Sequence, residues 1–128
     1  MPIKKINEFQ GQDGGVLLSG NAEGKDLMPE MSVHFMTLKP GNDVSPHVHD
    51  RVEVYVFLSG KAKVMTGDEI KEVSTGDVAI APIGTPHAIQ VLGNEPLLFY
   101  ALNSPPASTC PMEAASEEII AKFAKTSV

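Results

Sequence analysis

The sequence lacks tryptophan, contains a single cysteine and has only two tyrosines and five phenylalanines among its 128 residues. Because a disulfide needs two cysteines, Cys110 alone excludes an internal disulfide framework, and no histidine lies near it in sequence to activate it as a nucleophile. We interpret Cys110 as an incidental reduced thiol. The scarcity of aromatic side chains also argues against a base-stacking surface for single-stranded nucleic acid.

Positive charge and long apolar runs are scarce as well. The ten lysines and arginines are scattered along a chain of net charge −6, which argues against binding to nucleic acid or to an anionic membrane surface. No run of about 18 apolar residues is present, and the N-terminal residues MPIKKINEF lack the apolar core of a signal peptide. The sequence therefore predicts a cytoplasmic protein with no nucleic-acid or membrane partner.

The sequence does contain a regular succession of short apolar runs separated by turn residues. Its length and its hydrophobic content of 42% favour one globular domain. Runs such as SVHFMTL, VEVYVFL, KAKVM, HAIQVL and LLFYAL lie between segments rich in Gly, Asn, Asp and Pro. Strands at this spacing are typical of an all-β sandwich or barrel. Thr66–Gly67–Asp68 predicts a hairpin between KAKVM and EIKEV, with the lysines and glutamates on a solvated face.

Both ends of the chain depart from this pattern. The apolar residues of EEIIAKF (117–123) recur at helical spacing, and Ser116 before two glutamates is a favourable N-cap. We therefore predict a short amphipathic helix at about 115–125, packed on the outside of the barrel. Residues 1–10, ahead of the glycine-rich GQDGG, are predicted to form an N-terminal strand arm, and the barrel core is predicted to span about 30–103.

Two stretches, GNDVSPHVHDRVEVYVFLSG (41–60) and GDVAIAPIGTPHAIQV (76–91), place glycines, histidines and a glutamate at characteristic intervals. Fifteen residues separate the two stretches. Together they resemble the two motifs of the cupin superfamily, and the resemblance covers about 41–91. The first motif matches at every position. The second matches except at its last residue, where Val91 stands in place of the usual asparagine.

The resemblance implies a double-stranded β-helix (a jelly-roll barrel) whose metal ligands would be His47, His49, Glu53 and His87. The residues themselves agree with this assignment. His47 and His49 would share one face of a strand, and Glu53 can open the next strand. Three neutral imidazoles and one carboxylate suit a divalent first-row metal, and burying them without a cation would be unfavourable.

Other residues are candidates for the wall of the pocket. Tyr55 and Phe57 have the same strand parity as Glu53, so both are predicted to point into the barrel and to make the pocket small and apolar. His34 and Tyr55 are the candidate catalytic residues, although a histidine in a strand can also serve only a structural hydrogen bond. Arg51 could bind an anionic substrate or be a solvated or salt-bridged loop residue. Further candidates for the pocket wall are Met36, Met65, Phe99 and Tyr100.

A metal with open coordination positions in such a cavity suits several functions. We expect one divalent transition-metal ion (Fe, Mn, Ni or Zn) and an enzyme acting on a small oxygenated or anionic metabolite, with dioxygenase-type chemistry favoured over decarboxylation or isomerisation. A non-catalytic cupin that binds a small molecule or a sugar is the alternative. The resemblance to small single-barrel cupins also implies a homodimer, formed by sheet edges or by an exchanged N-terminal strand.

Overall fold

Short strands make up most of the structure, a computed structural model that describes Ile3, Lys5 and residues 13–18, 21–22, 25–26, 29–109 and 111–128. The strands are β1 (Gly14–Leu17), β2 (Asn21–Ala22), β3 (Lys25–Asp26), β4 (Ser32–Leu38), β5 (Val44–Val48), β6 (Val52–Ser59), β7 (Lys61–Thr66), β8 (Glu69–Val73), β9 (Val78–Ala81), β10 (His87–Leu92), β11 (Leu97–Ser104) and β12 (Glu113–Ala114). The helices of the described residues are a short 3₁₀ helix (Ala107–Thr109) and α1 (Glu117–Lys125). Most of the predicted N-terminal arm at 1–10 lies outside the described residues, as does Cys110.

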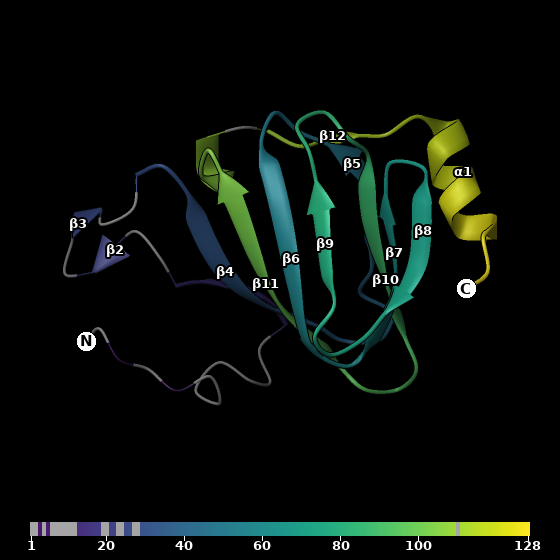
Figure 1. Ribbon diagram of the computed structural model, residues 1–128, viewed down its shortest axis with the longest axis horizontal. Coiled ribbons are helices and arrows are strands. Elements are labelled where there is room, and N and C mark those ends of the chain that lie inside the picture. The colour runs from purple at the N-terminus through teal and green to yellow at the C-terminus, as the bar shows by residue number, and fades with distance from the viewer. Residues whose placement is uncertain are drawn as a thin grey trace.

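Ten of the strands form two antiparallel sheets that pack face to face, and β2 and β3 pair as a separate two-stranded sheet (Figure 1). One, here the β6 sheet, has the strand order β1-β4-β11-β6-β9, and the other, the β10 sheet, has the order β12-β5-β10-β7-β8. Successive strands such as β5 and β6, or β9 and β10, lie in different sheets, so the chain crosses repeatedly between the two layers. This is the all-β jelly-roll barrel predicted from the sequence.

The core lies between the sheets and follows the alternation of side chains along each strand. Tyr55 and Phe57 of β6 and Phe99 of β11 are buried there, with the Phe99 ring centroid 5.4 Å from that of Tyr55 and 5.6 Å from that of Phe57. The predicted inward orientation of Tyr55 and Phe57 is confirmed. Val91 also packs in this core, and its backbone N–H donates to Asp43 Oδ1 at 3.0 Å.

The predicted hairpin and the predicted helix are both present. Thr66 pairs with Glu69 across the β7–β8 turn, where Gly67 adopts a φ of 61°, a conformation that glycine tolerates well. Helix α1 begins after Ser116, whose Oγ accepts the Ile119 N–H at 3.3 Å. It packs on the outside of the β10 sheet beside β7 and β8 (Figure 1). Within the described part of the chain, no helix has the length and apolar character that a bilayer span requires.

Lys63 differs from the prediction, which placed the lysines of KAKVM on a solvated face. Its side chain is only 5% exposed because α1 covers the outer face of β7 at this position. The Lys63 ammonium donates to the carbonyls of Phe123 at 2.6 Å and of Thr126 at 3.0 Å, and lies 4.5 Å from the centroid of the Phe123 ring. It therefore binds the C-terminal end of the helix, where backbone carbonyls lack helical partners.

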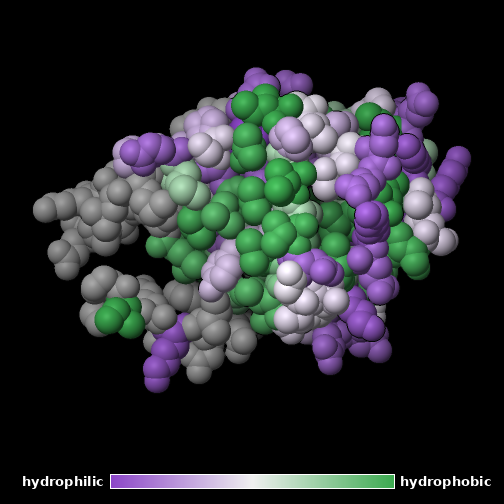
Figure 2. Space-filling model, viewed as in Figure 1, coloured by the Kyte–Doolittle hydropathy of each residue, from purple (hydrophilic) through white to green (hydrophobic). Residues whose placement is uncertain are grey.

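The outer face of the β6 sheet is apolar and is not covered by α1. Two cross-strand rows on β4, β11, β6 and β9 make up this face, and Figure 2 shows apolar side chains gathered over these strands. The rows are Val33, Leu102, Val54 and Ile80, and Phe35, Tyr100, Val56 and Val78. We call these eight residues the apolar face; an antiparallel sheet more often places polar residues on its outer side.

Candidate metal centre

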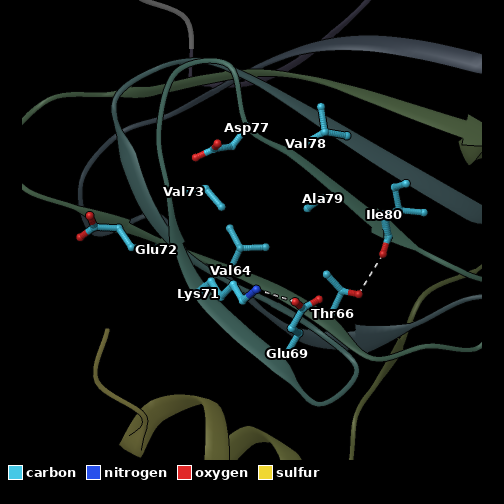
Figure 3. Close-up of a pocket in the computed structure, with 10 residues that line it drawn as sticks. All are labelled: Val64, Thr66, Glu69, Lys71, Glu72, Val73, Asp77, Val78, Ala79 and Ile80. Carbon is cyan, nitrogen blue, oxygen red and sulfur yellow. Dashed lines mark hydrogen bonds and ion pairs between the residues drawn. The ribbon is translucent and has the colours of Figure 1, made fainter.

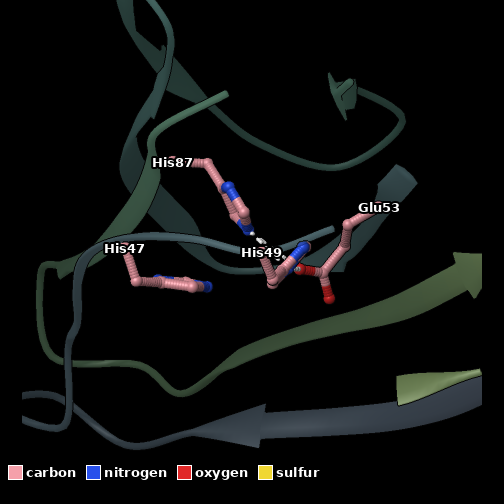
Figure 4. Close-up of side chains that lie close together, drawn as sticks. All are labelled: His47, His49, Glu53 and His87. Atoms are coloured by element: carbon pink, nitrogen blue, oxygen red, sulfur yellow. Dashed lines mark hydrogen bonds and ion pairs between the residues drawn. The ribbon is translucent and has the colours of Figure 1, made fainter. Parts of the chain in front are cut away.

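The four predicted metal ligands come together between the two sheets. His47 lies on β5, His49 directly follows that strand, Glu53 is the second residue of β6 and His87 is the first of β10. His47 and His87 are paired across the β5–β10 ladder. One potential ligand atom of each of the four residues lies within 4.8 Å of the others, and all four residues are buried. Figure 4 shows the side chains pointing toward one another.

The backbone next to each histidine fixes the orientation of its ring. Nδ1 of His47 lies 2.9 Å from the Ser45 carbonyl, Nδ1 of His49 lies 3.1 Å from that of Arg51, and Nδ1 of His87 lies 2.8 Å from that of Thr85. A carbonyl oxygen can only accept, so each Nδ1 carries the proton and donates it. In the neutral imidazole, Nε2 is then unprotonated and carries a free lone pair. This tautomer can bind a metal through Nε2.

These Nε2 atoms are brought close to one another and to a carboxylate. Nε2 of His49 and Nε2 of His87 are 3.1 Å apart, and each lies 3.0 Å from Oε1 of Glu53. Acceptors that face one another without a proton or cation between them are electrostatically unfavourable. A donor set of three imidazole nitrogens and one carboxylate oxygen fits a divalent first-row metal ion. The four residues could therefore hold such an ion.

Asn103, which the sequence analysis missed, orients the carboxylate of Glu53. Asn103 lies opposite Glu53 on the β11–β6 ladder and donates from Nδ2 to Glu53 Oε2 at 3.0 Å, while the Tyr55 hydroxyl donates to Oε1 at 3.0 Å. The signal for Asn103 was its parity in LLFYALNS, where it shares the inward face with Leu97 and Phe99. A polar residue at a core position of a strand needs a buried hydrogen-bond partner.

The environment sets the charge of each group. Burial by itself raises the pKa of Glu53, but the polar side chains of His87, Asn103 and His49, which lie within hydrogen-bonding distance of its carboxylate, outweigh burial and lower the pKa to about 2. Burial and the nearby Glu53 charge raise the pKa of the Tyr55 hydroxyl well above its ordinary value. Burial lowers the pKa of His47. At neutral pH the centre therefore contains an ionised carboxylate, a neutral phenol and a neutral His47.

A cavity of about 380 Å³ opens onto this cluster. Its apolar wall includes two of the four candidates for the pocket, Met36 and Phe99, and its polar wall includes His34, Arg51, Tyr55 and Asn103. The other two candidates are elsewhere. Met65 packs beneath α1, and Tyr100 lies on the apolar face with its ring centroid 6.0 Å from that of Phe35.

Arg51 was predicted either to bind an anionic substrate or to be a solvated or salt-bridged loop residue, and the structure shows that it is not solvated. It is 5% exposed and lies in the wall of this cavity, and its Nε donates to Asn103 Oδ1 at 2.7 Å. The loop between β5 and β6 therefore turns this side chain inward, and Arg51 lies in the sequence between the potential ligands His49 and Glu53.

A second hollow of about 420 Å³ lies between the β7–β8 hairpin and β9 (Figure 3). Its polar contacts are an ion pair between Lys71 and Glu69 at 2.8 Å and a hydrogen bond from Thr66 Oγ1 to the Ile80 carbonyl at 2.8 Å. The charged residues that line it are exposed, and none of its lining residues is a histidine or cysteine. The chemistry therefore points to the buried histidine cluster and not to this hollow.

Comparison with known proteins agrees with the fold. The family model described as "Cupin domain" matches residues 34–103, which include all four potential ligands and Asn103. The chain belongs to the cupin family. A solved cupin 2 domain-containing protein from Halorhodospira halophila superposes with a TM-score of 0.71 at 20% identity, over 90% of this chain and 81% of that one. This structural likeness concerns the fold alone.

Curated relatives of this cupin have diverse names. An uncharacterised protein from Streptomyces coelicolor is 35% identical over 61% of this chain and 73% of its own length. A putative mannose-1-phosphate guanylyltransferase from Vibrio cholerae is 31% identical over 66% of this chain, which spans only 18% of that protein. A 5-nitrosalicylic acid 1,2-dioxygenase from Bradyrhizobium is 23% identical over 66% of this chain and 41% of its own length.

Proposed function

We propose that this cupin binds a divalent first-row metal ion through His47, His49, Glu53 and His87, and that it is an enzyme acting on a small oxygenated or anionic metabolite. The observation that supports this most directly is the convergence of unprotonated imidazole nitrogens on Glu53 at the end of a cavity of about 380 Å³. That volume is within the ordinary range for a small-molecule site.

We favour dioxygenase-type chemistry over decarboxylation or isomerisation. The likeness to the nitrosalicylic acid dioxygenase supports this choice. When bound, a first-row ion would supply Lewis acidity and, for a redox-active metal, reactivity toward dioxygen. Three neutral imidazoles and one carboxylate would leave a divalent site with a formal charge of +1, which favours an anionic or enolisable ligand.

The residues beside the cluster would have separate roles. Tyr55 keeps its proton and donates to Glu53, so we assign it to positioning of the carboxylate and not to proton transfer. His34 lines the cavity without joining the cluster, and burial lowers its pKa, so it is neutral at pH 7. A neutral imidazole can accept a proton from a bound substrate, which keeps His34 as the candidate general base.

Isomerisation or sugar binding is the second candidate function. The likeness to the guanylyltransferase supports a sugar ligand, because the name of that protein specifies a phosphorylated sugar. Such a ligand is also oxygen-rich and anionic, so the same cavity and the same charges would serve.

Metal analysis and turnover measurements test these alternatives. The protein would be loaded separately with Fe(II), Mn(II), Ni(II) or Zn(II) and incubated with a library of oxygenated acids and sugars, in air and without oxygen. Oxygen uptake with product supports a dioxygenase, product without oxygen uptake supports an isomerase or decarboxylase, and binding of an unchanged ligand supports a non-catalytic cupin. Failure to bind any of the four metals overturns the proposal.

A further inference from the structure

We propose that Arg51 makes the metal cavity selective for small organic acids, by pairing with the substrate carboxylate while a second substrate oxygen faces the histidine cluster. The inference rests on the proposed function, because it names the substrate class of the same site. It adds a recognition residue that the metal-binding motif itself does not contain.

The position of Arg51 is the first observation. An arginine in a loop between two strands is ordinarily exposed, yet this one is 5% exposed and forms part of the cavity wall with His34, His47 and Glu53. Burying a permanent charge is unfavourable unless another group compensates it. Glu53, the other charged residue of this wall, carries the opposite charge, so the guanidinium is kept beside the cluster at a position where the two charges offset each other.

A hydrogen-bonded chain fixes the guanidinium relative to the metal ligands. Nε of Arg51 donates to Oδ1 of Asn103 at 2.7 Å, and Nδ2 of Asn103 donates to Oε2 of Glu53 at 3.0 Å. Only this orientation of the amide satisfies both neighbours, because a guanidinium cannot accept and a carboxylate cannot donate. Asn103 thus separates the two opposite charges by one amide group. The Arg51 charge is therefore held beside Glu53, and Nε of Arg51 bonds to Asn103 and not to the Glu53 carboxylate.

The charges on the cavity wall favour an anion. Arg51 and Glu53 are the charged residues that line the cavity, and their charges cancel. A divalent ion on the ligands would therefore leave the cavity with a net charge of +2. Burial, and to a smaller extent the Arg51 charge, lower the pKa of His34, so His34 adds no further cation at neutral pH.

The rest of the wall limits the kind of anion. Met36, Val44, Ile89 and Phe99 are apolar and supply no hydrogen bonds from their side chains. A phosphate needs several donors, whereas a carboxylate matches the planar fork of one guanidinium. A carboxylate with an adjacent hydroxyl or oxo group on a small apolar frame would satisfy Arg51, the metal and the apolar wall together.

Acids and their uncharged amides provide matched probes. The zinc-loaded full chain would be titrated calorimetrically with lactate and lactamide, and with salicylate and salicylamide. We expect at least one acid to bind about tenfold more tightly than its amide, as a charge-assisted pair would give. Arg51→Gln should abolish this preference while retaining zinc. Lys61→Gln, which removes an exposed cation outside the cavity, should leave the preference unchanged.

Zinc binding would be measured first, so that the two hypotheses can fail separately. If the wild-type protein does not bind zinc or the other metals, the proposed function fails. If zinc binds but neither acid is preferred over its amide, or the preference survives in Arg51→Gln, the role of Arg51 is overturned. Should Arg51→Gln unfold, Arg51→Met, which is apolar and unbranched, repeats the comparison under the same criterion.

Discussion

Each histidine of the cluster is oriented by a carbonyl only two residues away in the chain, so ring position and backbone conformation are coupled. We expect replacement of His49 by Ala to lower metal occupancy by about an order of magnitude or more, because one of four ligands is lost. The measurement is metal content after dialysis against a chelator. His34→Ala is the matched control, since His34 faces the same cavity outside the cluster. Stoichiometric metal in the His49→Ala protein would contradict the assignment.

Asn103 allows a test of how the ligand carboxylate is positioned. Asn103→Leu keeps a similar volume but removes the donor to Glu53 and the acceptor for Arg51. We expect zinc affinity to fall by about 10–100-fold, the usual effect of losing a group that orients a ligand. A competition titration against a chelating dye measures the affinity, and a thermal melt shows whether the variant is folded. A folded variant with unchanged zinc affinity would mean that Asn103 does not position Glu53.

Acid should release the metal through the histidines and not through Glu53. The imidazoles must be neutral to bind a metal, and their ordinary pKa is about 6.5. Burial lowers the pKa of His47, and the pKa of Glu53 is about 2, so Glu53 stays ionised while the histidines gain protons. Release should therefore be steep and lie below pH ~6.5. A zinc-sensitive dye can follow it during acidification. Full retention at pH ~4 would contradict three histidine ligands.

At the scale of strands and helices, the sequence predicted what depends on local pattern. The spacing of His47, His49, Glu53 and His87 identified a buried cluster that could hold a metal ion, and strand parity placed Tyr55 and Phe57 inside the barrel. The pattern could not show which outer face the C-terminal helix covers, because that depends on contacts between distant parts of the chain. Both lysines of β7 were therefore predicted to lie on a solvated face, although α1 buries Lys63 and leaves Lys61 exposed.

The same limit applies to the loop between β5 and β6. Its sequence, HDR (49–51), gives no sign that Arg51 turns inward, since the acceptor that holds it there comes from β11. Asn103 lies 52 positions further along the chain, and only the sheet pairing brings the two together. Contacts that combine a loop with a distant strand are set by tertiary structure, which explains why the four-residue cluster could be predicted from the sequence and its hydrogen-bonded supports could not.

The docking of α1 provides a test at this scale. Lys63→Met retains an apolar stem beneath Phe123 but removes the ammonium that binds the carbonyls of Phe123 and Thr126. We expect the free energy of unfolding to fall by about 1.5–3 kcal/mol, the usual range for a hydrogen bond to a charged group. Urea denaturation measures this value. Lys61→Met on the same strand is the control and should be close to neutral, and an equal effect of both substitutions would contradict the role of Lys63.

At the scale of the whole molecule, the two outer faces of the barrel differ. The β10 sheet is partly covered by α1, whereas the β6 sheet exposes part of the apolar face: Val78 and Ile80 are 55% and 56% exposed, and Phe35 is buried. None of the eight residues of the apolar face is charged, although the chain carries a net charge of −6. Two negatively charged copies would repel each other least through an uncharged surface. Rows of branched aliphatic side chains can also pack on an identical copy about a two-fold axis.

We therefore expect a homodimer that joins two apolar faces. Ile80→Lys should convert it to a monomer, because the substitution would bury an unpaired charge in the interface. Val128→Lys, an equivalent change at an exposed apolar residue outside the face, should leave the dimer intact. Light scattering at micromolar concentration measures the mass of both variants. A chain lacking residues 1–10 separates this arrangement from an exchanged N-terminal strand, which would lose the dimer on truncation. A monomeric full-length protein contradicts the dimer, and a dimeric Ile80→Lys protein contradicts the apolar face as its interface.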